Sequence, residues 1–188
     1  MNNEISFSKG NIVETLNSFS VNKCQIVNEK KKDVRDDDLF HLEYNPKKLK
    51  ILLWEPAEKP GTTIFVSSLV DGSDSLISIL SKKYGQESYK IYINIDSRSA
   101  YPSYLFAYRK QDIERVIRSS FEDKWTFYQK GTPLSIEDTS VYDKKKIVDR
   151  LNKEVITSLL KKKGWNIEGD LFWTPISEVT TIHLKFRD

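Results

Sequence analysis

The middle of the chain alternates apolar and polar side chains with the period of β-strands. Ile91, Ile93 and Ile95 are each separated by one polar or amphipathic residue, the pattern of a strand with one buried face. Segments 51–54 and 64–66 are apolar at every position, and the residues between them are rich in Pro, Gly and charge. We therefore predict a hairpin of two inner strands, followed by a strand that is buried on one side.

Further strands are predicted on both sides of this region. Segments 104–110, 113–120 and 125–130 follow one another across short polar turns, which favours an antiparallel meander. Near the N-terminus, segment 24–27 is a short apolar strand candidate. Residues 180–186 alternate again and predict a final strand.

Helical periodicity appears in three places. Apolar residues at i, i+4 and i+7 predict a short amphipathic helix just after Gly10-Asn11. A second helix is predicted to end at Gly85, because a glycine ends many helices in the left-handed conformation. A third is expected between Asn152 as N-cap and Gly164 as its end, with three lysines in its last turn and a tryptophan that folds back over it.

Together these elements predict an α+β fold, with a mostly antiparallel sheet of about seven or eight strands and three or four helices. The length of 188 residues suits one domain, residues 1–188. Segment 28–38 is almost free of apolar residues, so residues 1–45 are treated as an N-terminal arm or subdomain.

The composition of the chain excludes some classes of partner but does not identify a function. Thirty basic against twenty-seven acidic side chains leave a net charge of +3, far below that of a protein devoted to phosphate neutralisation. One cysteine excludes an intramolecular disulfide, and neither a signal peptide nor a membrane-length apolar run is visible. We therefore expect a cytoplasmic protein without a membrane partner, and nucleic acid is an unlikely ligand on charge alone.

Recognisable catalytic, metal and nucleotide motifs are absent from the sequence. The seven glycines form no phosphate-binding loop. His41, His183 and Cys24 are too scattered to predict a metal site, and Cys24 in an apolar run is typical of a small buried residue rather than a nucleophile. Residues 71–74 at a strand-to-helix junction suit an anion site, yet the same residues are ordinary helix caps. No cofactor or metal is expected.

Aromatic and arginine residues interleave between residues 92 and 128. Tyr and Arg are enriched at the centres of protein interfaces, and the same residues stack on single-stranded bases. The alternative is that about half of these aromatics face inward and pair across strands. The partner-binding residues selected from this region are Tyr104, Tyr108, Arg109 and Arg118.

An acidic stretch lies near the N-terminus of this slightly basic chain. It is rich in aspartate and suits a surface that covers a basic site on another protein. As candidate partner-binding residues it contributes Asp33, Asp36, Asp37, Asp38 and Glu43.

Residues 125–151, with Trp125-Thr126-Phe127-Tyr128, Gly131-Thr132-Pro133-Leu134, Glu137-Asp138, Tyr142, Ile147 and Asp149-Arg150-Leu151, look like stretches of small bacterial proteins. In size and in its lack of enzymatic motifs, the chain is similar to immunity proteins of contact-dependent or polymorphic toxin systems. That resemblance implies a non-enzymatic protein that binds and neutralises one cognate protein toxin; it transfers no individual residues, since these proteins share no single fold.

Two alternatives remain open. A small enzyme with a dispersed site would use residues such as Asp96, Arg98, Glu178 and His183. A nucleic-acid-binding module would use the arginines and tyrosines of the strands, against the low net charge.

Overall fold

The computed structural model describes residues 2–5, 9–17, 21–36, 48–68, 74–94 and 102–186, and everything below refers to these residues. The strands are β1 Asn2–Ile5, β2 Val21–Glu29, β3 Lys48–Trp54, β4 Ile64–Ser67, β5 Ser88–Asn94, β6 Ser103–Lys110, β7 Ile113–Phe121, β8 Trp125–Lys130 and β9 Val179–Phe186. The helices are α1 Lys9–Asn17, α2 Asp74–Tyr84, α3 Lys153–Lys163 and α4 Asp170–Trp173, with 3-10 turns η1 Val34–Asp36, η3 Thr139–Asp143 and η4 Ile147–Asp149.

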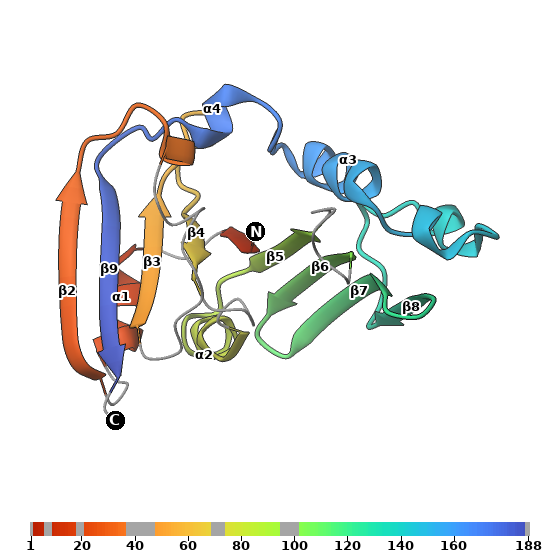
Figure 1. Cartoon of the computed structure of the whole chain (residues 1–188), viewed down its shortest axis with the longest axis horizontal. Helices are drawn as coiled ribbons and strands as arrows, with labels where there is room; N and C mark the ends of the chain where they lie inside the picture. The colour runs from red at the N-terminus through yellow and green to blue at the C-terminus, as the bar shows by residue number, and fades with distance from the viewer. Residues whose placement is uncertain are drawn as a thin grey trace.

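The described strands form one nine-stranded sheet in the order β2-β9-β3-β4-β1-β5-β6-β7-β8. Every neighbouring pair is antiparallel. Two four-stranded halves, β2-β9-β3-β4 and β5-β6-β7-β8, meet at the short strand β1, as Figure 1 shows. The predicted α+β class with an antiparallel sheet is confirmed, and so are the β3–β4 pair and the β6-β7-β8 meander.

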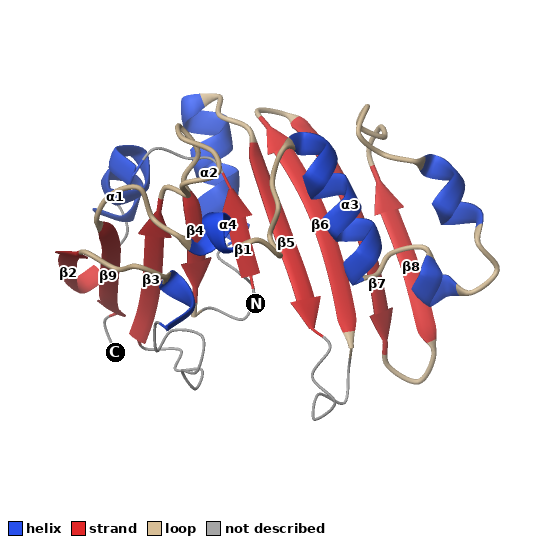
Figure 2. Cartoon of the chain, turned by 90° about the horizontal axis from the view of Figure 1, so that it is seen from above, coloured by secondary structure: helices blue, strands red, loops and turns tan. Residues whose placement is uncertain are grey.

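Helices lie on both faces of the sheet (Figures 1 and 2). α1 and α2 pack on one face through Ile12, Leu16, Ile77 and Leu80. α3 and α4 belong to the core on the opposite face, which extends beneath β5, β6 and β7. Strand β3 is buried on both sides, because its side chains contribute alternately to the two cores. This explains why segment 51–54 is apolar at every position.

α3 has the ends that its sequence predicts. The side chain of Asn152 accepts a hydrogen bond from the Val155 N–H at 3.0 Å, which satisfies one free donor of the first turn. Gly164 ends the helix in the left-handed conformation, with φ of 91°. Trp165 then folds back and is 3% exposed. Lys59 adds a hydrogen bond of 2.7 Å to the carbonyl of Lys163, so a cation lies at the negative end of the helix.

The N-terminal residues belong to the same sheet as the rest. β1 lies between β4 and β5, and β2 pairs with β9 along eight residues. α1 begins at Lys9, slightly before the position expected from its apolar pattern. Within the described residues, no helix is long and apolar enough to cross a membrane.

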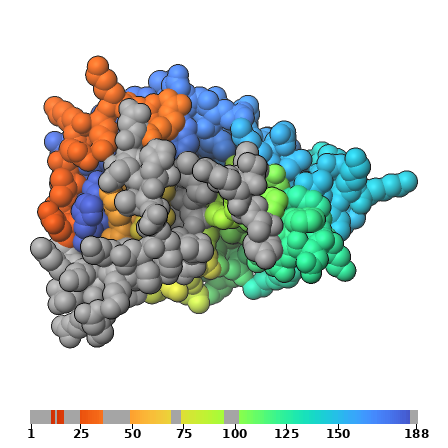
Figure 3. Space-filling view, viewed as in Figure 1, coloured from red at the N-terminus to blue at the C-terminus, as the bar shows by residue number. Residues whose placement is uncertain are grey.

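A buried ion pair fixes the segment that follows the meander. Arg115 and Glu137 have side chains that are 1% and 0% exposed, and their charged groups lie 2.7 Å apart. Arg115 also donates to the carbonyls of Lys130 and Gly131, at 3.3 and 3.0 Å. Residues 131–150, coloured teal to cyan, thereby stay attached to the meander at one end of the molecule (Figure 3).

Candidate functional site

The half-sheet β5-β6-β7-β8 has α3 packed on one face. We call its other face, on the far side of the sheet from α3, the open face. Its side chains come from alternate positions of β5 to β8, on the other side of the sheet from the buried Phe106 and Ile117. Among the described residues, the start of α2 lies beside it, and the surface there forms a hollow of about 430 Å³. The open face consists of Lys90, Tyr92, Leu105, Ala107, Arg109, Glu114, Val116, Arg118, Tyr128 and Lys130.

The register of the strands arranges these side chains in rows. Tyr92 lies opposite Leu105, Leu105 opposite Arg118, and Arg118 opposite Tyr128. Neighbouring strands are about 4.8 Å apart, so this row spans about 14 Å. Arg118 is exposed and the Tyr128 side chain keeps 54% of its surface in solvent. The row is therefore an aromatic and apolar strip with one cation in it, and we call it the Tyr-Arg row.

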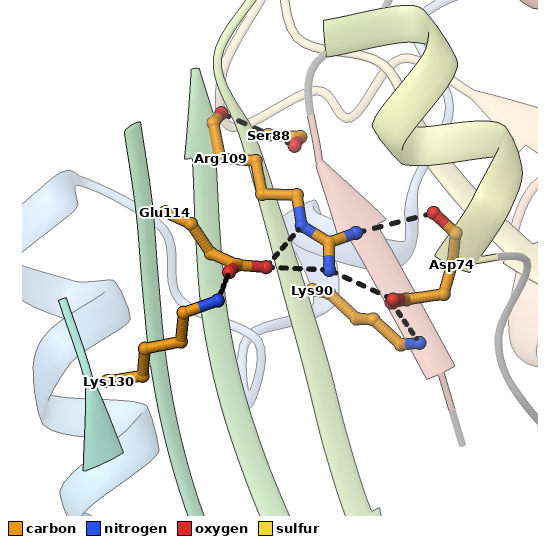
Figure 4. A network of polar contacts seen from close by, with 6 residues as sticks. All are labelled: Asp74, Ser88, Lys90, Arg109, Glu114 and Lys130. Atoms are coloured by element: carbon orange, nitrogen blue, oxygen red, sulfur yellow. Dashed lines mark hydrogen bonds and ion pairs between the residues drawn. The ribbon is translucent and has the colours of Figure 1, made fainter. Parts of the chain in front are cut away.

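Charged residues follow at one end of the open face and form a chain of ion pairs (Figure 4). Asp74, in the first turn of α2, accepts hydrogen bonds from Lys90 at 2.8 Å and from Arg109 at 2.9 Å. Glu114 accepts from Arg109 at 2.9 Å and from Lys130 at 2.6 Å. Each carboxylate thus bridges two cations, and the chain joins α2 to four strands.

The ion-pair chain keeps its carboxylates ionised. Burial alone raises the pKa of Asp74, but hydrogen bonds from Lys90 and Arg109 outweigh it, so the pKa lies below its usual value. The hydrogen bond from Lys130, helped by Arg109, lowers the pKa of Glu114. Both carboxylates are therefore ionised at neutral pH, and the bonds of the ion-pair chain hold the five side chains in place.

The predicted aromatic and arginine residues divide between the two faces. Arg109 and Arg118 lie on the open face. Tyr104 and Tyr108 point to the opposite side, since successive strand residues face opposite ways. Tyr108 is only 8% exposed and packs against Tyr89 at a ring distance of 5.1 Å. Tyr104 stacks on Trp125 at 6.1 Å. The structure thus brings the two arginines together and places the two tyrosines in or beside the core.

The acidic stretch is only partly described. Asp33 is half-buried and accepts a hydrogen bond of 2.8 Å from the backbone N–H of Arg35, whose guanidinium also pairs with it. Arg35 reaches Asp170 as well, at 2.9 Å, and η1 ends at Asp36. The pairing with Arg35 lowers the pKa of Asp33. The other acidic candidates, Asp37, Asp38 and Glu43, lie outside the described residues.

The residues considered for chemistry are not assembled into a site in the described part of the chain. His183 is exposed on β9, opposite Gln25 and Lys50, and Cys24 lies opposite Leu184 in the β2–β9 pair. No group of three His, Cys, Asp or Glu residues that could hold a metal occurs within the described ranges. Residues 41, 71–73, 96 and 98 lie outside them.

Sequence reasoning missed most of the open face. The sequence predicts either an anion site or helix caps at residues 71–74, while the structure places the Asp74 carboxylate between Lys90 and Arg109. The two-residue period of a strand could have indicated this face. It places residues 105 and 109 on the same side of their strand, and residues 114 and 118 on the same side of theirs, once one face of each strand is known to be buried. Comparison of the chain with protein-family models, with curated proteins and with solved structures gives no match.

Proposed function

We propose that this protein is a non-enzymatic binding domain that holds another protein against its open face. The observation that carries the proposal is the Tyr-Arg row, in which two tyrosines, a leucine and an arginine lie side by side across four strands. Tyr and Arg are enriched among the few residues that carry most of the binding energy at protein interfaces, because they combine apolar area with directed hydrogen bonds.

The open face is large enough for the centre of a protein interface but not for a whole one. Two further rows of β6 and β7 extend it along the strands beyond the Tyr-Arg row, one with Val116 and the buried Ala107 and one with Arg109. Two residues of strand span about 7 Å, so the rows cover roughly 14 Å by 14 Å, or about 200 Å². A stable interface buries about 800 Å² on each partner. The open face would therefore be the centre of an interface whose rim includes the neighbouring turns.

The specific form that we propose is immunity to a toxin. It rests on the resemblance of residues 125–151 to stretches of small bacterial proteins, and on the chain's likeness to immunity proteins in size and in its lack of enzymatic motifs. Tyr128 lies in that segment and also on the open face. An immunity protein needs a surface that binds one partner and excludes water from the contact, and it needs no catalytic chemistry. The Tyr-Arg row suits this role.

The test is recovery of the partner from the native host with a tagged protein. The wild type is compared with Tyr128→Ala and with Leu171→Ala, a matched control because Leu171 on α4 is 59% exposed and Tyr128 is 54% exposed. We expect one stoichiometric protein partner with the wild type and the control. Truncation of a central aromatic residue should weaken binding by about tenfold or more.

A separate growth assay tests whether the recovered partner is a toxin. The recovered partner is expressed alone and then together with the wild type, Tyr128→Ala or Leu171→Ala, and growth is recorded. Growth arrest that the wild type and Leu171→Ala relieve, and Tyr128→Ala relieves less, supports immunity. A partner that does not arrest growth would refute immunity while leaving protein binding intact. Recovery of the same partner with Tyr128→Ala at unchanged affinity would refute the open face as the binding surface.

A further inference from the structure

The open face carries more positive than negative charge. Among the side chains that the structure describes, four cations lie on it against two carboxylates, Glu114 on the face itself and Asp74 at its edge, and both carboxylates belong to the ion-pair chain. The cations are Lys90, Arg109, Arg118 and Lys130, and the carboxylates are Asp74 and Glu114.

Three of the four cations are already paired. Lys90 and Arg109 share Asp74, and Arg109 and Lys130 share Glu114, at distances from 2.6 to 2.9 Å. These three are held in place by their partners, and they add a positive potential to the surface around them. Within the described side chains, the ion-pair chain contains three cations and two carboxylates, so its own net charge is positive.

Arg118 differs from the other three cations. It is exposed, and among the described residues it has no ion-pair partner. Leu105 lies opposite it on one side and Tyr128 on the other. A guanidinium offers a planar fork of donors that fits a carboxylate in bidentate fashion, and apolar neighbours that exclude water strengthen such a pair.

We propose that the partner surface is acidic and that it places a carboxylate side chain on Arg118, between Leu105 and Tyr128. This inference rests on the proposed function, since it states the chemistry of the partner at the same surface. It reverses the expectation drawn from the acidic stretch, in which the partner would be basic. Positive potential from the ion-pair chain would steer the acidic surface toward Arg118.

An acidic protein fits this surface better than a single-stranded nucleic acid does. A nucleic acid binds a track of free Lys and Arg side chains, with several nucleotides along one groove. Here three cations are already bonded to carboxylates, whose negative charge would face the phosphates. One free arginine matches one carboxylate, and the net charge of the whole chain is only +3.

The test uses two defined probes and the full chain. A ten-residue glutamate peptide and a ten-residue oligothymidylate are each titrated into ¹⁵N-labelled protein, with the signals of the open-face amides and of the Arg118 side chain as readout. The variants are Arg118→Gln, Arg118→Lys and the matched control Lys145→Gln, which removes an exposed cation elsewhere. The amide spectrum of each variant also verifies that it is folded.

We expect the glutamate peptide to shift the signals of Arg118 and of its cross-strand neighbours. Arg118→Gln should weaken this binding at least tenfold, Arg118→Lys should retain part of it, and Lys145→Gln should retain all of it. Raising the salt from 50 to 200 mM should weaken the binding of the glutamate peptide to the wild type, because salt screens an exposed charge pair.

Three results would overturn the proposal: no shift at Arg118 with the peptide, equal affinity for Arg118→Gln, or tighter binding of the oligothymidylate. These failures are distinct from failure of the proposed function. A protein partner that is recovered in a Tyr128-dependent manner, combined with indifference of Arg118 to the glutamate peptide, would keep protein binding and discard the acidic partner.

Discussion

Removal of one charge from the buried Arg115–Glu137 pair should destabilise the protein strongly. The Glu137 side chain is fully buried, and it accepts hydrogen bonds from Arg115 at 2.7 Å, from the Leu134 N–H at 2.9 Å and from the Tyr142 hydroxyl at 2.8 Å. Glu137→Leu leaves the Arg115 cation, 1% exposed, without a counter-charge. Breaking a buried pair in this way costs about 3–5 kcal/mol.

That cost is large compared with the whole free energy of unfolding, which is about 5–15 kcal/mol for a natural domain. With a urea dependence of about 2 kcal/mol per molar, the unfolding midpoint should fall by about 1.5–2.5 M. The assay is urea unfolding followed by tryptophan fluorescence and by circular dichroism. The matched control is Glu168→Leu, which removes an exposed carboxylate paired with Lys153 and Lys161 and should change the midpoint little.

The double variant Arg115→Met with Glu137→Leu separates the charge from the packing. With neither charge present, no buried ion is left uncompensated, so the double variant should unfold at higher urea than Glu137→Leu alone. If Glu137→Leu shifts the midpoint no more than Glu168→Leu does, or if the double variant is less stable than Glu137→Leu, then the pair does not hold residues 131–143 in the manner described.

Three further predictions concern the same scaffold. Gly131→Ala should cost more than about 2 kcal/mol, because Gly131 has φ of 84° and an added Cβ would lie 2.0 Å from the Glu114 carbonyl oxygen. Gly61→Ala is its control, with φ of 81° and open space around it, and thermal melts of both should isolate the steric part. The folded-state pKa of Glu114 is lowered, so its stabilising contribution is present above its unfolded pKa and is lost as pH falls through the folded one. Melts from pH 7 to pH 3 should show a shallower decline in acid for Glu114→Gln than for the wild type; equal slopes would contradict the ion-pair chain. Asn152→Ala should lower the unfolding free energy by about 1 kcal/mol in urea titrations, through loss of the α3 cap, and an unchanged value would remove that role.

Local patterns in the sequence determined most of the elements. Strands that the structure contains were predicted by the alternation at 91–95 and by the apolar runs at 51–54 and 64–66. The short polar turns predicted where the strands of the meander are separated. Asn152 and Gly164 predicted the two ends of α3. These features depend on neighbours within a few residues, where side-chain period and capping chemistry act directly on the backbone.

Tertiary structure alone decided which face of each strand is buried. In β6 both sets of alternate residues contain large apolar side chains, so the pattern does not say whether Tyr104 and Tyr108 or Leu105 and Arg109 face the core. The position of α3 and of residues 131–150 settles this, because their apolar side chains cover Phe106 and Tyr108.

The chain of ion pairs could not be predicted from the sequence either. Asp74 and Lys130 are more than fifty residues apart, and they belong to one network only because α2 begins beside the meander and β1 joins the two halves of the sheet. Local sequence determines the period of a strand and the ends of a helix. Proximity between distant charges, and thus the chemistry of the open face, follows only from the order and register of the strands.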